Sequence, residues 1–179
     1  MKIALLILSF VFAFSFASHA QKGNNQIGVA FETGIPVGDF GEINKAGFGG
    51  SAKGLFGVGT VGQISLTSGY TSYSTKSKYL QSGEKETIGI VPVLAGYRHN
   101  LNSFFIEPQV GVGIYSIHDS GSSDDLNDSK ASFTWALGVG YKINNVELGL
   151  RYQNGKVNDW ISTFEFVGLH LGYNFSLGK

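Results

Sequence analysis

His118-Asp119-Ser120 brings together the three residue types that a hydrolase uses as base, orienting acid and nucleophile. Adjacent residues at a strand end point in different directions, so we interpret this run as the polar start of a loop rather than a triad. His170 is the other candidate, with Glu147 and Arg151 expected on the neighbouring strand. Because no serine or threonine is convincingly placed near His170, we assign no catalytic residue.

Four aspartates between residues 119 and 128 could hold calcium or bridge through cations to lipopolysaccharide phosphates. Their spacing matches neither the EF-hand nor the repeat-type calcium motifs, so we expect a solvated loop, no metal site and no cofactor. Lys76, Lys78 and Lys85 lie beside Tyr79 and could touch anionic lipid headgroups.

The N-terminus reads as a secretory signal. Lys2 precedes an apolar stretch from Ile3 to Ala17, and Ser18-His19-Ala20 places small residues at the −3 and −1 positions of a cleavage site. This apolar stretch is short for a membrane span, which needs about 20 residues. We therefore predict a cleaved signal peptide over 1–20 and a single domain over 21–179.

Composition excludes several classes of protein. Without Lys2, 12 basic residues stand against 13 acidic ones, a net charge near −1, which argues against nucleic acid as a partner. The chain has no cysteine, so neither disulfides nor thiol chemistry can hold it or run a reaction. Its 26 glycines and 13% aromatic residues favour a tightly turned all-β protein.

Eight segments alternate between an apolar and a small or polar face, which predicts eight strands. The clearest is 131–143, where Phe133, Trp135 and Leu137 oppose Ser132, Thr134 and Ala136. The segments are 26–35, 48–57, a third containing Ile64 to Tyr70, 87–99, 104–117, 131–143, 146–154 and 162–177. Short turns at 57–61, 100–103 and 144–145 alternate with longer polar connections at 36–47, 73–87, 118–131 and 154–161.

This arrangement predicts an eight-stranded antiparallel up-and-down transmembrane β-barrel, with the turns in the periplasm and the long loops outside. Two sets of aromatic residues would mark the two membrane interfaces. Towards the outer rim we place Tyr70, Tyr73, Tyr115, Trp135, Tyr152 and Trp160, and towards the inner one Phe56, Tyr97, Phe104, Tyr141, Tyr173 and Phe175. A soluble, lipocalin-like periplasmic barrel is the architectural alternative.

Segment 87–99 alternates poorly, so its own pattern does not show which of its residues point inward. Its pairing with segment 104–117 decides which side chains face lipid and which face the interior. We expect Tyr97 opposite Ile106 and Val93 opposite Val110, with these residues towards lipid. Proline cannot donate to the hydrogen-bond ladder, so we expect bulges or irregular pairing near Pro92 and Pro108.

An eight-stranded barrel has an interior just wide enough for side chains. The charges expected inside it must find partners, because an unpaired buried charge is very costly. Lys142 and Glu147 should face each other across the Asn144-Asn145 hairpin. We interpret this interior set as a structural plug, with a gated ion path as the alternative; its members are Glu32, Lys53, Arg98, Glu107, Lys142, Glu147, Arg151 and His170.

The last strand resembles the C-terminal assembly signal of bacterial outer-membrane proteins, a polar residue, a glycine and two alternating hydrophobic residues, here His170, Gly172, Phe175 and Leu177. The whole mature chain resembles eight-stranded outer-membrane barrels of the OmpA/OmpX type. Gly34 to Gly41, Val91 to Arg98 and Glu107 to Gly113 resemble motifs of the glycine-rich barrels common in Bacteroidetes.

The resemblance implies a Gram-negative outer-membrane location, contact with lipids and lipopolysaccharide, and insertion by the barrel-assembly machinery. It carries no catalytic residues over, because the family shares none. We therefore expect a structural role or interaction with an extracellular partner through the loops. The alternatives are an outer-membrane lipid-modifying enzyme of the deacylase or acyltransferase type, or a narrow gated channel. The oligomeric state stays open.

Overall fold

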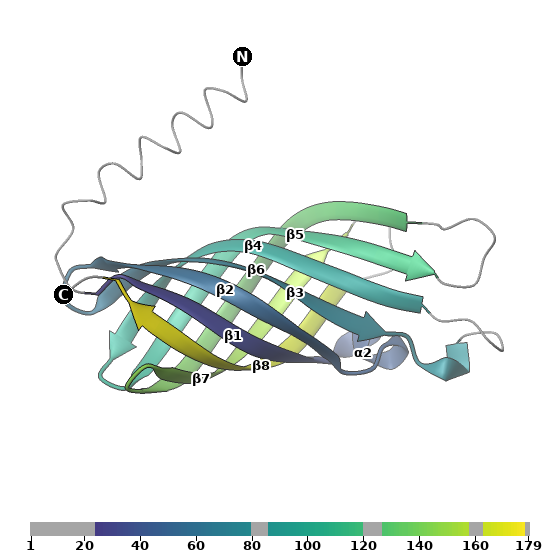
Figure 1. The fold of residues 1–179 in the computed structure, drawn as a ribbon. Coiled ribbons are helices and arrows are strands. Elements are labelled where there is room, and N and C mark those ends of the chain that lie inside the picture. Colours follow the sequence, from purple (N-terminus) through teal and green to yellow (C-terminus); the bar gives the residue numbers. More distant parts are fainter. Residues whose placement is uncertain (1–23, 80–85, 120–126, 158–162, 178–179) are drawn as a thin grey trace, which may run out of the picture.

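The computed structural model describes residues 24–79, 86–119, 127–157 and 163–177. These residues form one closed barrel in which every strand pairs antiparallel with its neighbours in chain order, and β1 pairs with β8 (Figure 1). The strands are β1 (Gln26–Pro36), β2 (Gly47–Val58), β3 (Gly62–Ser74), β4 (Glu86–Leu101), β5 (Phe104–Asp119), β6 (Asn127–Ile143), β7 (Val146–Lys156) and β8 (Thr163–Ser176). The predicted eight-stranded antiparallel barrel is confirmed.

The two faces of each strand differ in the way a membrane requires. On the outside, large apolar side chains stay exposed, such as Phe133 at 66% and Phe104 at 61%. On the inside lie buried charged and amide groups, among them Arg98 and Gln63. A barrel folded in water would bury its apolar face instead, because removing apolar surface from water drives folding. The lipocalin-like alternative is therefore wrong.

Three tight turns lie at one end of the barrel, where β1 also begins and β8 ends (Figure 1). Gly59, Asn102 and Asn144 take positive φ angles of 67°, 57° and 55°, which glycine and asparagine tolerate best. The longer connections lie at the opposite end, as predicted. Among the described residues, no helix is long and apolar enough to cross a membrane.

The first long connection is not a plain loop. Residues Gly38–Ile43 form the short helix α2, and a one-turn helix η2 covers Ser77–Tyr79 in the second connection. The sequence did not indicate α2, since two of its six residues are glycines, which weaken helices by about 1 kcal/mol each. Its Phe40 is buried against the outer end of the bore.

The predicted pairing of β4 with β5 is wrong by two residues. Ile106 pairs with His99 rather than Tyr97, and Val93 pairs with Val112. The cause is the turn: Leu101 pairs with Phe104, so only two residues lie between the strands instead of four. A slip of two leaves each side chain on the face that we predicted, because the period of a strand is two.

Both prolines interrupt the ladder without shifting its register. Pairs between β3 and β4 stop at Ser68–Val93 and resume at Thr71–Ile90, so the ladder skips Pro92. The β4–β5 pairs likewise skip Pro108, yet the register is the same on both sides of the gap. The pairing is irregular, as expected for a residue that lacks an N–H, but neither site is a bulge.

Candidate functional site

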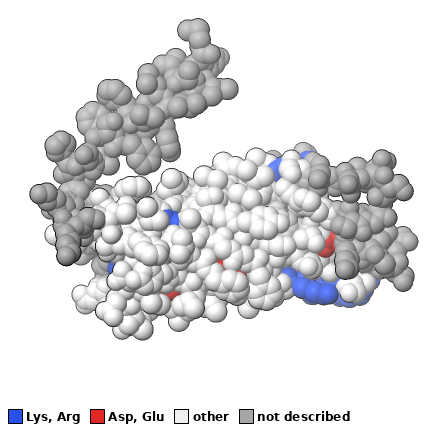
Figure 2. All heavy atoms as spheres, viewed as in Figure 1, with Lys and Arg blue, Asp and Glu red and all other residues white. Residues whose placement is uncertain are grey.

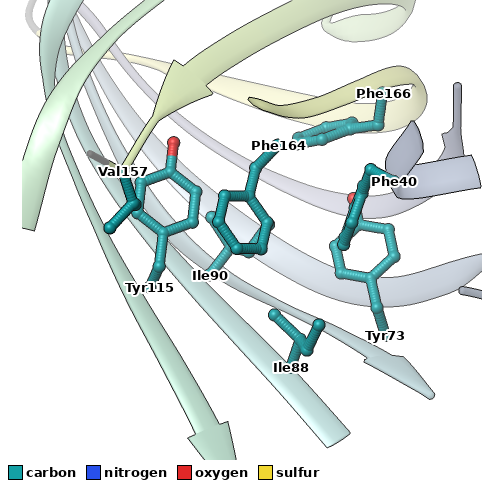
Figure 3. Packing of buried hydrophobic residues seen from close by; sticks show 8 residues of the cluster. All are labelled: Phe40, Tyr73, Ile88, Ile90, Tyr115, Val157, Phe164 and Phe166. Carbon is teal, nitrogen blue, oxygen red and sulfur yellow. The ribbon is translucent and has the colours of Figure 1, made fainter. Parts of the chain in front are cut away.

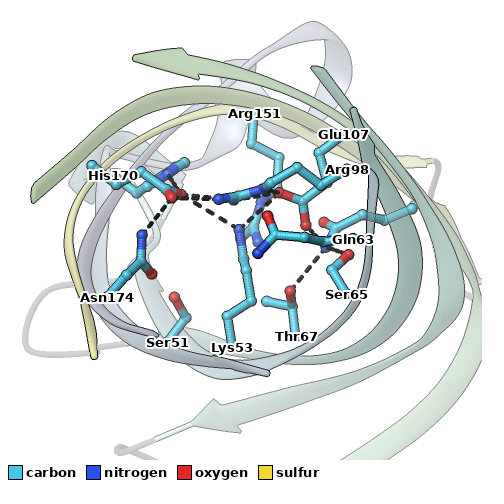
Figure 4. A network of polar contacts seen from close by, with 12 residues as sticks. Ser51, Lys53, Gln63, Ser65, Thr67, Arg98, Glu107, Arg151, His170 and Asn174 are labelled. Atoms are coloured by element: carbon cyan, nitrogen blue, oxygen red, sulfur yellow. Dashed lines mark hydrogen bonds and ion pairs between the residues drawn. The ribbon is translucent and has the colours of Figure 1, made fainter. Parts of the chain in front are cut away.

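Arg98 lies at the centre of a buried ionic cluster inside the bore (Figure 4). Its guanidinium donates to Glu107 Oε2 at 2.9 and 2.6 Å and to the Glu147 carboxylate at 2.5 and 2.8 Å. The same group stacks over the ring of Phe105, 3.8 Å from its centroid. These contacts fix a planar cation from both edges and one face, which suits arginine better than lysine.

Lys53 joins the two carboxylates from the opposite wall. Its Nζ lies 3.1 Å from Glu107 Oε2 and 3.7 Å from Glu147 Oε1. The two glutamates thus share two cations. Burying four charges is costly, but mutual pairing and hydrogen bonds to each carboxylate offset much of that cost.

Three further side chains, His170, Asn174 and Gln109, complete the cluster. His170 Nε2 lies 2.9 Å from Glu147 Oε1, and Asn174 donates to Glu147 Oε2 at 2.9 Å. Gln109 donates to Glu107 Oε1 at 2.9 Å. Alternation places Asn174 and Gln109 on the inward faces of their strands as well, but the predicted set held charged side chains only and so left out these two amides.

A second, smaller cluster pairs Arg151 with Glu32, two members of the predicted interior set whose pairing the sequence did not specify. Arg151 Nη2 lies 2.7 Å from Glu32 Oε2, and Ser51 donates to Glu32 Oε1 at 2.5 Å. A cavity of about 10 Å³, large enough for one water molecule, adjoins both clusters. Its lining includes Glu32, Ser51, Lys53, Glu147, His170 and Asn174.

Lys142 lies apart from both clusters. Its backbone faces Glu147 across the hairpin as expected, but its Nζ donates to Asn100 Oδ1 at 2.5 Å instead. Asn100 in turn donates to Gln63, and Gln63 donates to Asn24, so a chain of amide hydrogen bonds crosses the end of the barrel at which the tight turns lie. Five of the eight expected charges therefore meet in one cluster, two form a separate pair, and Lys142 joins neither.

The outer half of the bore is filled by aromatic and aliphatic side chains (Figure 3). The Phe40 ring contacts Tyr73 and Phe164 with centroids 5.2 Å away in each case, and Tyr115 stacks on Phe164 at 4.7 Å. We name this set the aromatic plug: Phe40, Tyr73, Ile88, Ile90, Tyr115, Val157, Phe164 and Phe166.

Tyr73 and Tyr115 correct our assignment of aromatic residues to the outer membrane interface. Both are fully buried in the aromatic plug, because each lies at an inward position of its strand. Glycines two strands away make room for their hydroxyls: a Cβ on Gly34 of β1 would lie 2.0 Å from Tyr73 Oη, and a Cβ on Gly155 of β7 would meet Tyr115 Oη. Tyr70 and Trp135 do face outward, whereas Trp160 lies outside the described residues.

The two motifs considered for catalysis and metal binding, His118-Asp119-Ser120 and the aspartate-rich loop, lie partly outside the described residues. His118 pairs with Thr87 and Asn127 in the sheet, while Ser120 lies outside the described residues, as do Asp124 and Asp125 of the aspartate-rich loop. In the part of the chain that the structure describes, no group of three or more histidine, cysteine, aspartate or glutamate residues could hold a metal ion.

The assembly-signal residues divide between the faces of β8. His170 lies in the ionic cluster, and a Cβ on Gly172 would lie 3.1 Å from the Ala30 side chain. Phe175 and Leu177 are exposed on the lipid side, at 51% and 46%.

The first two outer connections are joined into one body. Asn44 and Thr75 form a β-bridge, Lys45 N donates to Ser74 O at 2.9 Å, and Lys76 N donates to Ile43 O at 2.8 Å. Lys76 Nζ also donates to the last carbonyls of α2, Gly41 O at 2.6 Å and Glu42 O at 3.2 Å. We name residues 38–45 with 74–79 the loop platform.

Exposed lysines and an aromatic ring lie on the loop platform. Lys45, Lys78 and Tyr79 are all exposed, and Lys78 Nζ lies 4.6 Å from the centroid of the Tyr79 ring. Figure 2 shows the contrast: the barrel wall in this view is nearly free of charged atoms, and blue atoms gather towards the outer end.

A closed antiparallel barrel with an apolar exterior, a polar and aromatic interior and long connections at one end defines an integral outer-membrane β-barrel of bacteria. The chain belongs to the outer membrane protein beta-barrel domain family, whose model matches residues 3–175. No curated protein matches the chain by sequence.

Solved structures agree on the fold. The chain is similar to Ail, the attachment invasion locus protein of Yersinia pestis (TM-score 0.67, 16% identity, covering 87% of this chain and 100% of that one). It is also similar to Ail in complex with the heparin analogue sucrose octasulfate (0.63, 15%, 84% and 97%). A third similar structure is the N-terminal β-barrel domain of Pseudomonas aeruginosa OprF (0.59, 13%, 86% and 100%).

Proposed function

We propose that this barrel has a structural and interaction role in the outer membrane, and that its loop platform binds the phosphorylated saccharides of lipopolysaccharide. One observation carries the proposal: the loop platform is held by backbone hydrogen bonds and still exposes Lys45, Lys78 and Tyr79. Ammonium groups attract phosphates, and an aromatic face packs against sugar rings. The complex of Ail with a sulfated saccharide is consistent with this chemistry.

The filled bore supports a structural role. The aromatic plug lies in the outer half of the bore and the ionic clusters lie further in, so buried side chains fill the bore at both levels among the described residues. In this proposal the interior charges rigidify the tube rather than conduct or react. His170 accordingly contacts Glu147 as a packed polar residue, and we assign it no reaction.

Binding to lipopolysaccharide tests the proposal. The double variant Lys45→Gln/Lys78→Gln, purified in detergent, should bind phosphorylated lipopolysaccharide several-fold more weakly than the unchanged protein in calorimetric titration. Lys45→Arg/Lys78→Arg is the matched control and should bind normally, because it keeps both charges. Lipopolysaccharide stripped of its phosphates should bind all three proteins equally weakly. Equal binding by the glutamine variant would refute the role of the platform.

A lipid-modifying enzyme remains the competing function from another class. It would have to release or transfer a fatty acid when the purified barrel is reconstituted with lipids. We expect no product in that assay, because His170 Nε2 contacts Glu147 and the Ser51 hydroxyl, which lines the same cavity, donates to Glu32 rather than to His170. A product that disappears in a His170→Gln variant would instead establish the enzyme.

Two further steps belong to this proposal. We propose that residues 1–20 are removed on export, so that mass spectrometry of the mature protein should find Gln21 at the N-terminus. We also propose that the barrel-assembly machinery recognises the C-terminal strand through Phe175 and Leu177. Both side chains are exposed on the lipid-facing side of the barrel. Polar substitutions at these two positions should lower the amount of inserted protein.

A further inference from the structure

Three side-chain oxygen atoms meet at the outer end of β3. The β-bridge places Asn44 opposite Thr75, and Thr75 N donates to Glu86 O at 3.1 Å, so the three residues stand side by side on adjacent segments. Residues directly opposite each other in a sheet have Cβ atoms about 4.5–5.5 Å apart, within reach of short side chains. Thr75 Oγ1 lies 2.8 Å from Glu86 Oε1 and 3.3 Å from Asn44 Oδ1.

This group of oxygen atoms is short of hydrogen. A threonine hydroxyl carries one hydrogen atom, whereas amide and carboxylate oxygens only accept hydrogen bonds. The Thr75 hydroxyl can therefore serve one neighbour at a time, and the shorter distance favours Glu86. Asn44 Oδ1 is then without a donor among the described residues, although Asn44 is only 4% exposed. A buried acceptor of this kind requires an explanation.

Exchanging the two atoms of the Asn44 amide does not remove the shortage. In the observed orientation, Asn44 Nδ2 donates to Phe40 O at 3.2 Å. The opposite orientation would supply a hydrogen to Thr75, but it would turn Oδ1 against the Phe40 carbonyl oxygen. The hydrogen-bond network therefore keeps Asn44 Oδ1 towards Thr75 and Glu86.

The carboxylate of Glu86 has no countercharge in the described part of the chain. The ion pairs between described residues lie deeper in the bore, and none of them includes Glu86. The Lys76 ammonium, one residue beyond Thr75, donates to the last carbonyls of α2 instead. Glu86 is partly exposed, so a cation can reach this group from the water outside.

We propose that Asn44 Oδ1, Thr75 Oγ1 and the Glu86 carboxylate bind a calcium ion, with water completing its coordination shell. Calcium prefers carboxylate, amide and other uncharged oxygens, and a cation needs no hydrogen from them. It would therefore satisfy all three atoms at once. The inference goes beyond the proposed function, because it does not require the loop platform to bind lipopolysaccharide.

The distances between the oxygen atoms favour calcium over magnesium. Two oxygens that both lie about 2.4 Å from a calcium ion, at an angle of about 72–90°, are roughly 2.8–3.4 Å apart. Both observed distances, 2.8 and 3.3 Å, fall in this range. Magnesium holds its ligands about 2.05 Å away in a regular octahedron, which sets neighbouring oxygens about 2.9 Å apart. The wider pair is too long for that geometry.

The position of the site gives the ion a structural effect. Asn44 follows α2, Thr75 follows β3, and Glu86 is the first residue of β4. A calcium ion would therefore fasten both parts of the loop platform to the barrel wall. The sequence does not indicate this site, because Asn44 and Thr75 are 31 residues apart and only one of the three ligands is acidic.

A calcium titration tests the inference. The labelled barrel is placed in nanodiscs of zwitterionic phospholipid without lipopolysaccharide, and amide NMR shifts are followed at constant ionic strength. The amides of Asn44, Thr75 and Glu86 should shift and saturate with a dissociation constant of about 10⁻⁴–10⁻³ M, as in other extracellular sites. Magnesium should need a concentration about tenfold higher or more. No saturation with calcium, or equal binding of both ions, would overturn the proposal.

Two substitutions locate the ion. Glu86→Gln keeps the shape of the side chain and removes its charge, so it should weaken calcium binding about tenfold or more. Thr75→Val removes the central oxygen and should weaken binding as well. Glu42→Gln, the same change at an exposed carboxylate of α2, is the matched control and should bind calcium normally. Unchanged calcium binding in a folded Glu86→Gln or Thr75→Val barrel would place the ion elsewhere and refute the assignment.

This site and the proposed lipopolysaccharide site can fail separately. Lys45→Gln/Lys78→Gln should bind calcium no more weakly than the unchanged protein, because it removes positive charge only. Glu86→Gln should bind lipopolysaccharide normally when a chelator removes divalent cations. Hydrogen exchange gives a second measure: calcium should slow exchange of the Asn44 and Thr75 amides about tenfold in the unchanged protein and not in Glu86→Gln. Equal slowing in both would contradict the calcium site.

Discussion

Single side chains in the bore have few substitutes, because each completes the hydrogen bonding of its neighbours. Glu147 shows this best: it accepts bonds from Arg98 and Asn174, contacts His170, and lies 3.7 Å from Lys53. At this scale the sequence predicts the direction of the interior side chains but not all of their contacts. Alternation placed all eight expected charges on the inward face, but it could not show that Lys142 reaches Asn100 rather than Glu147, since side-chain reach across a barrel depends on strand stagger.

Glu147→Gln should destabilise the barrel by about 3–5 kcal/mol, because it leaves Arg98 and Lys53 sharing the single carboxylate of Glu107 in a buried site. The urea concentration at the unfolding midpoint in detergent, followed by tryptophan fluorescence, measures the change. Glu42→Gln, on the exposed side of α2, is the control and should shift the midpoint little. An unchanged midpoint for Glu147→Gln would show that the cluster does not stabilise the fold.

Gly34→Ala should displace the aromatic plug, because the new Cβ would lie 2.0 Å from Tyr73 Oη. The cost should be about 1–3 kcal/mol, as for other overpacked cores. Removing the hydroxyl with Tyr73→Phe should restore much of the stability in the double variant. Gly138→Ala, also inside the bore, has its nearest contact at 3.6 Å and should be tolerated. Additive effects in the Gly34 and Tyr73 pair would argue against this contact.

Among the elements, the strands follow from the sequence and α2 does not. Alternation of apolar and polar residues is strong over ten or more residues, so all eight strands were predicted within a few residues of their ends. The two-residue slip between β4 and β5 arose from the turn, where Asn102 with φ 57° allows a tighter connection than its neighbours suggested. α2 has low intrinsic helix propensity, and it is held in place by the packing of Phe40 and by hydrogen bonds from Lys76 to its last carbonyls.

Phe40→Ala should release α2 from the barrel. The substitution removes two ring contacts and leaves a cavity, which costs about 3–5 kcal/mol in a core. Hydrogen exchange at the Asn44 amide, which donates to Phe40 O at 3.0 Å, should then accelerate strongly while the strands keep their protection. Asp39→Ala, at an exposed neighbouring position, should leave this exchange rate unchanged. If both variants behave alike, Phe40 does not anchor the helix.

At the scale of the whole molecule, two layers of side chains lie one above the other in the bore, the ionic clusters and the aromatic plug. Together they decide whether an ion could cross the barrel. Polar groups around Arg98 could be hydrated from the periplasmic end, but the aromatic plug and α2 close the outer end with apolar groups. If the bore has the structural role that we propose, an ion path would require both layers to open, because rearranging the salt bridges alone would lead ions to an apolar barrier. Eight strands leave room for side chains but little else.

Planar bilayer recordings separate this filled barrel from the gated channel that the sequence left open. We expect no steady conductance from the unchanged protein, from Lys53→Met, or from Phe40→Ala/Tyr73→Ala, because each keeps at least one filling intact. Conductance should appear only when the aromatic pair and Arg98→Ser are combined, provided that circular dichroism still shows the barrel. Openings of the unchanged protein that Lys53→Met abolishes would make the ionic cluster a gate and would overturn the structural role of the bore.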